Sequence, residues 1–227
     1  LIKLNKQVAI LSAKKFAMYT LGLLFLALGV TASIKSDLGV SPLNSMPYVL
    51  SQITGMEMGM VVTATFSTFI LLQILILRKE FKVINLLQLP FASISGYFIS
   101  MTNSWFSLVP PAEGVIMKLA ILALGIVIVA FGLLFYLTAE IVPLPPEGFM
   151  LAITQKTGIP FPKTKVGVDC GMVGMAALMS VAAFGKLTGV GVGTVLSAIF
   201  IGKTLGVLSK RGKPMLKALL QTKLSVQ

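Results

Sequence analysis

Long runs of apolar residues alternate with short polar or basic segments along most of the chain. A helix needs about 20 residues, mostly apolar, to cross a bilayer, and six runs come close to that length. They predict membrane spans at residues 16–34, 60–77, 83–101, 115–138, 166–184 and 187–208. The pattern therefore predicts an all-α, polytopic membrane protein with six transmembrane helices.

Two shorter segments, 41–54 and 144–157, follow the first and fourth of these spans. Each holds about 14 residues, which is too few to cross a bilayer. Each starts close to a proline and is followed by a glycine, Gly55 or Gly158, and these residues are typical of a helix start and a helix stop. We predict that both segments form short re-entrant or interfacial helices.

The short segments belong to a weak internal repeat. Segment 27–55 returns at an offset of 103 residues as segment 130–158, with a proline at the same place and a shared Gln-x-Thr-Gly ending. An apolar helix that meets a carboxylate and then breaks at proline occurs in both copies. Duplicated units with broken helices around a central site are typical of membrane transporters.

The number of spans in each copy determines how the two copies are related. Three spans are an odd number, so the second copy enters the membrane upside down relative to the first. We therefore predict an inverted 3+3 repeat, with repeat one over about 16–101 and repeat two over about 115–208, in a single membrane domain over 1–227. Such a repeat brings its two broken elements together near the bilayer midplane, where transporters bind their cargo.

The composition supports a membrane protein and restricts its chemistry. Apolar residues make up 56% of the chain, charged residues only 11%, and the mean hydropathy is +0.95. Soluble domains carry about 25% charged residues. Cys170 is the only cysteine, and histidine is absent, which removes the commonest metal ligand and the usual neutral-pH proton carrier. We expect no metal site, no cofactor and no enzymatic activity.

Lysine and arginine gather in alternate loops, as cytoplasmic loops do. The basic groups are Lys3, Lys6, Lys14 and Lys15; Arg78, Lys79 and Lys82; Lys156, Lys163 and Lys165; and Lys210, Arg211, Lys213, Lys217 and Lys223. This distribution predicts that both termini are cytoplasmic and that loop 102–114 lies outside. The first span lacks a cleavage pattern, so we expect it to be retained. Anchoring at anionic lipid accounts for the net charge of +12 without nucleic acid as a partner.

Six polar residues near the ends of the apolar segments are the candidate substrate-binding residues. They are Asp37, Asn44, Glu140, Glu147, Gln155 and Asp169. Charge at such a depth is costly and is usually functional. The alternative is that the acids cap helices or lie among headgroups, since an acid in a first helical turn complements the helix dipole. Asp37 and Glu140 rank highest because the repeat places them at corresponding breaks.

Small-residue motifs account for most of the remaining conspicuous patterns. Gly189-Val-Gly-Val-Gly193 does not fit a nucleotide-binding fingerprint, and close packing of helices explains it better. The pairs Gly167 with Gly171 and Gly202 with Gly206 are likewise predicted to be packing faces. Lys35 and Lys203 either pair with Asp37 and Glu140 or extend their ammonium groups to the interface.

The run GVTASIKSDLGVSPLNSMPYVLSQITGMEMG resembles the signature of the YitT/YczE family of bacterial integral membrane proteins. Gly193-Thr194 and Gly202 are similar to the closing segment of that family. The chain departs from the pattern at the second break, where Pro143, Pro145 and Pro146 are crowded together. The resemblance implies a multi-pass protein of the bacterial inner membrane that is transporter-like, and it implies neither catalytic residues nor a substrate.

Taken together, these features favour a secondary transporter or permease for a small polar solute. The excess of acids at the breaks favours a cationic or zwitterionic solute, whereas the helix starts at Pro42 and Pro145 favour an anion. A carboxylate shielded from water binds a proton more readily, so one of the acids could carry a coupling proton. Two alternatives remain, a substrate-capturing subunit that works with an ATPase and a non-transporting assembly or lipid-handling factor. A homo-oligomer is compatible with the sequence.

Overall fold

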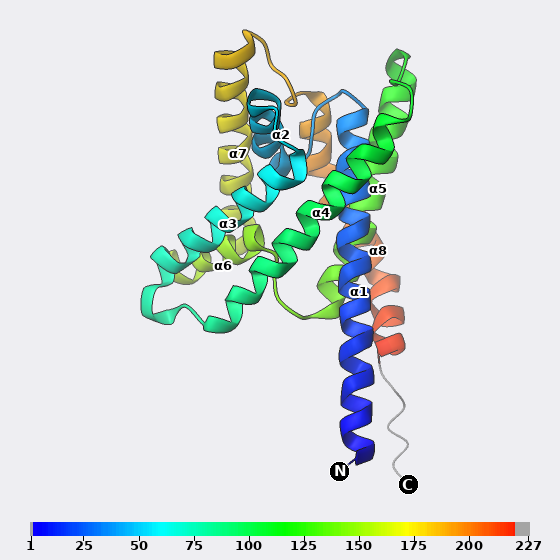
Figure 1. The fold of residues 1–227 in the computed structure, drawn as a ribbon, viewed down its shortest axis with the longest axis vertical. Coiled ribbons are helices and arrows are strands. Elements are labelled where there is room, and N and C mark those ends of the chain that lie inside the picture. The colour runs from blue at the N-terminus through cyan, green and yellow to red at the C-terminus, as the bar shows by residue number, and fades with distance from the viewer. Residues whose placement is uncertain (1, 221–227) are drawn as a thin grey trace.

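The computed structural model describes residues 2–220, with side chains from residue 8 onward, and all of its regular structure is helical (Figure 1). Lys3, Lys6 and Lys223 of the basic termini lie outside the described side chains. The α-helices are α1 (Ile2–Lys35), α2 (Pro42–Thr54), α3 (Met58–Leu77), α4 (Gln88–Ser107), α5 (Gly114–Ala139), α6 (Pro145–Thr157), α7 (Phe161–Phe184) and α8 (Val192–Leu220). Short 3-10 turns at Arg78–Glu80 and Val83–Leu87 connect α3 to α4.

Six helices are long and apolar enough to cross a membrane, as the hydropathy pattern predicted. They are Val8–Lys35, Met58–Glu80, Val83–Ser107, Gly114–Ala139, Phe161–Phe184 and Val192–Leu220. The sixth begins at Val192 instead of residue 187, because the chain turns at Gly189 with a positive φ of 74°. The protein is therefore an all-α, multi-pass membrane protein.

The two short segments form helices of the predicted length. Helices α2 and α6 each contain 13 residues and start with a proline in the first turn. Each ends at a left-handed glycine, Gly55 with φ of 70° or Gly158 with φ of 73°. Glycine adopts this conformation without the steric penalty of a Cβ atom, and its N–H satisfies a carbonyl of the last helical turn.

Helices α1 and α5 cross closely at four glycines. A Cβ atom on Gly22 would lie 2.9 Å from the carbonyl oxygen of Gly132, and a Cβ on Gly29 would lie 2.8 Å from that of Gly125. The order of these pairs shows that the two helices run in opposite directions. Gly22 and Gly125 are 103 residues apart, as are Gly29 and Gly132, so equivalent residues of the two copies make this contact.

The glycine-rich segment before α8 packs against the break between α1 and α2. Val40 donates its N–H to the carbonyl oxygen of Gly189 at 2.9 Å, and Gly193 donates its N–H to that of Leu38 at 2.7 Å. A Cβ atom on Gly191 would lie 2.6 Å from the Leu38 carbonyl oxygen. This confirms that close packing explains the Gly189-Val-Gly-Val-Gly193 motif.

The last two helices of the two halves differ in how they pack. Helices α3 and α4 lie against each other where Gly59 meets Gly96, with no room for a side chain at either position. Helices α7 and α8 are not packed along each other, and most of their surface is exposed. Within the described residues, nothing lies within 4 Å of the Cβ positions at Gly167, Gly171, Gly202 and Gly206. The prediction that these glycines are packing faces is therefore wrong for contacts inside the chain.

The start of α1 and the end of α8 lie at the same end of the molecule (Figure 1). The Lys14 ammonium donates to the carbonyl oxygen of Leu219 at 3.2 Å, which joins the two segments. In the same view α2 lies higher than α6 beside the long helices, so the two short helices lie at different levels along them.

Candidate functional site

A cavity of about 200 Å³ lies between the N-terminal turns of α2 and α6. Ser41, Pro42 and Asn44 line it from α2, and Pro146 and Glu147 line it from α6. The cavity is otherwise walled by α1, α3, α4, α5, α7 and α8. The two breaks predicted from the sequence therefore meet at one internal space.

Four polar side chains of the second half gather in this cavity, namely Glu147, Lys165, Asp169 and Ser197. Lys165 forms an ion pair of 2.6 Å with Oδ2 of Asp169, one turn further along α7. Three buried oxygens of this group lack a hydrogen-bond partner among the described residues: Glu147 Oε2, Asp169 Oδ1 and Ser197 Oγ. Buried polar atoms are nearly always paired, so unpaired oxygens lining a cavity indicate a place where a ligand can donate hydrogen bonds.

Glu147 also lies at the boundary between this cavity and a second pocket. The second pocket includes Tyr136, Glu140 and Phe161 as well as Glu147. The Tyr136 hydroxyl accepts a hydrogen bond of 3.0 Å from the Leu144 N–H, which ties α5 to the start of α6 beside Glu147. Glu147 thus lies next to this contact and lines both spaces.

A buried pair of amides fixes the start of α6. Gln73 and Gln88 exchange hydrogen bonds of 3.0 and 3.1 Å, and Gln73 also donates to the Pro145 carbonyl oxygen at 3.2 Å. A Cβ atom on Gly148 would lie 2.7 Å from Oε1 of Gln73, so the helix approaches this pair as closely as glycine allows. The position of Glu147 therefore depends on two glutamines from α3 and α4.

We expect Gln73→Leu to lower the free energy of unfolding by roughly 1–3 kcal/mol, because it leaves the Gln88 amide buried without its partner. The double variant Gln73→Leu/Gln88→Leu should be less destabilised than the sum of the two single variants, because neither amide then remains unpaired. A double-mutant cycle on thermal stability in detergent measures this coupling. Additive losses would show that the two amides do not depend on each other.

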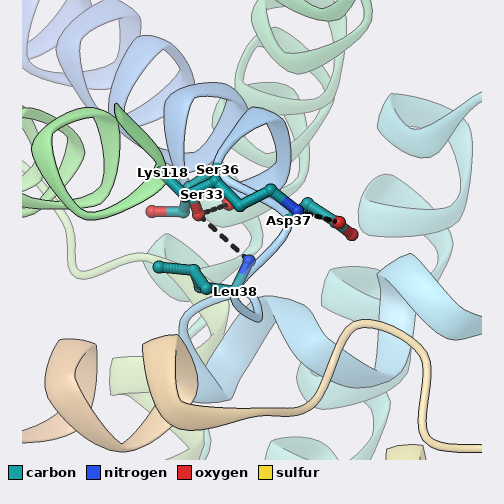
Figure 2. Close-up of polar contacts among 5 residues, drawn as sticks. All are labelled: Ser33, Ser36, Asp37, Leu38 and Lys118. Atoms are coloured by element: carbon teal, nitrogen blue, oxygen red, sulfur yellow. Dashed lines mark hydrogen bonds and ion pairs between the residues drawn. The ribbon is translucent and has the colours of Figure 1, made fainter. Parts of the chain in front are cut away.

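Asp37 and Glu140 lie at corresponding helix ends but outside the cavity. Both adopt left-handed backbone conformations, with φ of 54° and 51°. Asp37 is 81% exposed and pairs with Lys118 at 2.7 Å, as Figure 2 shows, next to the Ser36 hydroxyl that accepts a hydrogen bond from the Leu38 N–H. Glu140 is 55% exposed and pairs with Lys217 at 2.9 Å. The structure thus places the two highest-ranked candidates in surface ion pairs.

The ion pair of Glu140 predicts a specific dependence of stability on pH. The hydrogen bond and charge of Lys217 lower the pKa of the Glu140 carboxyl below its ordinary value of 4.5. Because the pKa of this carboxyl is lower in the folded state than in the unfolded state, the ion pair stabilises the fold above pH 4.5. This stabilisation is lost as the pH falls through the pKa of the folded state. We expect Glu140→Gln to be slightly less stable than wild type by the same amount throughout about pH 5.5 to 8, with the difference vanishing on acidification. Melting temperatures across this range test it, and a difference that changes near neutral pH would contradict it.

The remaining predicted residues divide between the cavity and the surface. Asn44 lines the cavity and donates to the Ser41 hydroxyl at 3.1 Å. Glu147 and Asp169 also line it. Gln155 lies at the exposed end of α6 and donates to Glu80 at 2.8 Å, together with Lys156, so it fastens α6 to the turn after α3. Lys35 contacts the Val109 carbonyl, and Lys203 lies 5.5 Å from the centre of the Phe200 ring.

Comparison with known proteins places the chain in a family. Residues 13–210 match the model of a family of unknown function, DUF6198. The chain belongs to this family. It is 28% identical over 192 residues to the uncharacterized membrane protein YczE of Bacillus subtilis (strain 168), covering 84% of this chain and 83% of that protein. It is 26% identical over 198 residues to the uncharacterized protein YyaS of the same organism, covering 85% and 91%. No solved structure matches the chain.

The match to the DUF6198 family confirms the resemblance found in the sequence but gives no activity, so any function has to follow from the chemistry of the cavity.

Several cavity-lining residues are related by the offset of 103 residues. These pairs are Leu26 with Val129, Val30 with Leu133, Asn44 with Glu147, Phe66 with Asp169, Ser95 with Ala198 and Ile99 with Gly202. The two halves therefore supply equivalent positions, but the second half supplies both acids and the smallest side chains.

Three site residues were not predicted from the sequence: Lys165, Ser197 and Tyr136. Lys165 was counted only as a loop charge, although its spacing of four residues from Asp169 on one helix is a signal for an ion pair. Ser197 and Tyr136 carry no such signal, because a hydroxyl within an apolar span is common and only the fold shows which ones line a cavity.

Proposed function

We propose that this protein is a transporter of a small molecule with a cationic or zwitterionic polar group. The binding site is the cavity between α2 and α6. The observation that carries the proposal is that the first turns of both short helices enclose a single space containing two carboxylates with unpaired oxygens, Glu147 Oε2 and Asp169 Oδ1. Transporters with duplicated, broken helices bind their cargo in such a place.

The balance of charge in the cavity supports an ammonium group as the recognised feature. Two acids face one base, and Lys165 already pairs with Asp169. Glu147 has no cationic partner at hydrogen-bond distance among the described side chains, so a ligand ammonium would supply the missing charge and donors. The first turn of α2 contains no acidic residue. The positive end of the α2 dipole, beside the Asn44 side chain, therefore offers a place for the carboxylate of a zwitterion.

Several observations support the inverted repeat predicted from the sequence. The glycines of the α1–α5 crossing, the left-handed residues Asp37 and Glu140, and the ends of α2 and α6 all recur at an offset of 103 residues. Lys118, which pairs with Asp37, corresponds to Lys15, whose charge acts on Glu140. A two-fold axis in the membrane plane accounts for these reciprocal contacts.

We further propose that the protein lies in a bacterial inner membrane with both ends cytoplasmic. Six spans and the proximity of Lys14 to Leu219 are compatible with ends on one side, and the basic loops favour the cytoplasmic side. Labelling of cysteines introduced at Ser104 and Ser209, in a Cys170→Ser background, tests this topology. Only the first should react from outside.

Transport by the purified chain alone tests the proposed function. We expect proteoliposomes to accumulate radiolabelled methylammonium or glycine, as a cationic and a zwitterionic probe whose ammonium groups carry N–H donors, in a saturable manner. Glu147→Gln should abolish this uptake, whereas Glu140→Gln should not. Lack of saturable uptake and of saturable binding for both probes would contradict the proposal. Binding without uptake would also contradict transport by this chain alone and would favour a capture subunit with an ATPase partner.

A further inference from the structure

The cavity opens sideways, between α7 and α8. Among its lining residues, the exposed ones are Lys165 on α7 and Ala198 and Gly202 on α8, while the others are buried or half-buried. Both helices belong to the set that is long and apolar enough to span a membrane. An opening between two such helices faces the bilayer, so a molecule can enter it from the lipid phase.

The equivalent side of the cavity is closed. Phe66, Ser95 and Ile99 occupy the positions that correspond to Asp169, Ala198 and Gly202, and all three are buried. Helices α3 and α4 meet there at Gly59 and Gly96. The corresponding positions in α7 and α8 are Pro162 and Ile199, which cannot make the same contact. The residues at these equivalent positions therefore close the cavity between α3 and α4 and leave it open between α7 and α8.

The size and lining of the cavity limit what it can hold. A volume of about 200 Å³ equals that of roughly seven water molecules, so it accepts a small headgroup but no long chain. The charged groups of the cavity are Glu147, Lys165 and Asp169, and they lie on its second-half side. The other polar lining residues are the small or amide side chains Ser41, Asn44, Ser95 and Ser197, and the remaining walls are mostly apolar. A hydrocarbon chain attached to the headgroup would have to leave through the opening between α7 and α8.

We infer that the cargo is an amphipathic amine that enters from the bilayer. Its ammonium group lies between Glu147 and Asp169, and its hydrocarbon chain passes Ala198 and Gly202 into the lipid. This inference rests on the proposed binding site and adds the route and the chemical class of the cargo. The unpaired carboxylate oxygens select the ammonium group, and the lateral opening selects the hydrocarbon chain.

Gly202→Ile tests the route, because it copies Ile99 from the closed side. The matched control is Gly206→Ile, which lies one turn further along α8, is equally exposed with open space around it, and does not line the cavity. The probes are dodecylammonium and methylammonium, with protein in phosphatidylcholine nanodiscs. Specific binding is defined as the saturable binding of a probe that is lost in Glu147→Gln. This definition excludes simple partition of the probe into lipid.

We expect Gly202→Ile to weaken dodecylammonium binding by roughly tenfold or more relative to Gly206→Ile, while methylammonium binding stays within about twofold. Ala198→Phe, with Val195→Phe as its control, should give the same pattern if Gly202→Ile does not fold. Unchanged dodecylammonium binding in both blocked variants would overturn the lateral route. If methylammonium binding remained saturable and Glu147-dependent, the proposed function would then survive without the lateral route.

Two other outcomes would also overturn the inference. If neither probe shows Glu147-dependent binding in the wild type, the binding site itself is wrong. If Gly202→Ile changes the oligomeric state in nanodiscs while Gly206→Ile does not, the opening is covered by a second copy of the chain and not by cargo.

Discussion

Replacing Gly59 by valine is expected to destabilise the protein strongly, because no side chain fits between α3 and α4. A Cβ atom at this position would overlap the Gly96 carbonyl oxygen and lie 2.5 Å from the Ser100 hydroxyl. The carbonyl belongs to a helix backbone, so the clash can be relieved only by moving the helices apart. Overpacking typically costs about 1–3 kcal/mol, and a backbone clash lies at or above the upper end of that range.

A loss of roughly 3 kcal/mol corresponds to a decrease of about 6–12 °C in melting temperature for a chain of this size. Gly171→Val is the control, because its Cβ would meet nothing within 4 Å and the residue also lies within a membrane span. Both variants carry the same helix-propensity penalty, so the difference between their melting temperatures in detergent isolates the clash. Equal melting temperatures would show that α3 and α4 are not in contact at these glycines.

Glu147→Gln is expected to remove binding of a cationic probe while leaving the fold intact. The carboxylate lines the cavity and has an unpaired buried oxygen, so its charge is costly for the fold unless a ligand compensates it. Truncating one member of a buried, hydrogen-bonded charge pair typically costs about 2–5 kcal/mol, which is roughly 30-fold or more in affinity. The melting temperature without ligand should be unchanged or higher.

This combination separates a binding residue from a structural one. A structural acid would lose stability and affinity together when neutralised. Methylammonium affinity and ligand-free melting temperature, measured on the same preparation, give the two values. A variant that melts much earlier than wild type and still binds the probe would show that Glu147 holds α6 in place and does not contact cargo.

Much of the fold follows from the sequence, because the signals involved are local. Length and hydropathy predict the spans, and proline and glycine mark the ends of α2 and α6 within a residue or two. The start of α8 is harder to predict from the sequence. Residues 187–191 are apolar enough to continue the span, but Gly189 turns the chain so that its carbonyl oxygen can bind the Val40 N–H.

The candidate site is only partly predictable, because it depends on which way each side chain faces. The repeat places Asp37 and Glu140 at equivalent helix ends, but the left-handed backbone directs both toward the surface, where Lys118 and Lys217 lie. Glu147 comes seven residues after Glu140, past the break, and faces inward. No periodic pattern reveals this difference, since it arises from the turn that joins α5 to α6.

In the proposed function the cavity acids, and not the acids at the helix ends, bind the cargo. Isothermal titration of methylammonium into two double variants tests this assignment most directly. The first variant, Glu147→Gln/Asp169→Asn, should show no saturable binding, and the second, Asp37→Asn/Glu140→Gln, should bind like the wild type. Loss of binding in the second variant with full retention in the first would place the site at the helix ends and contradict the account.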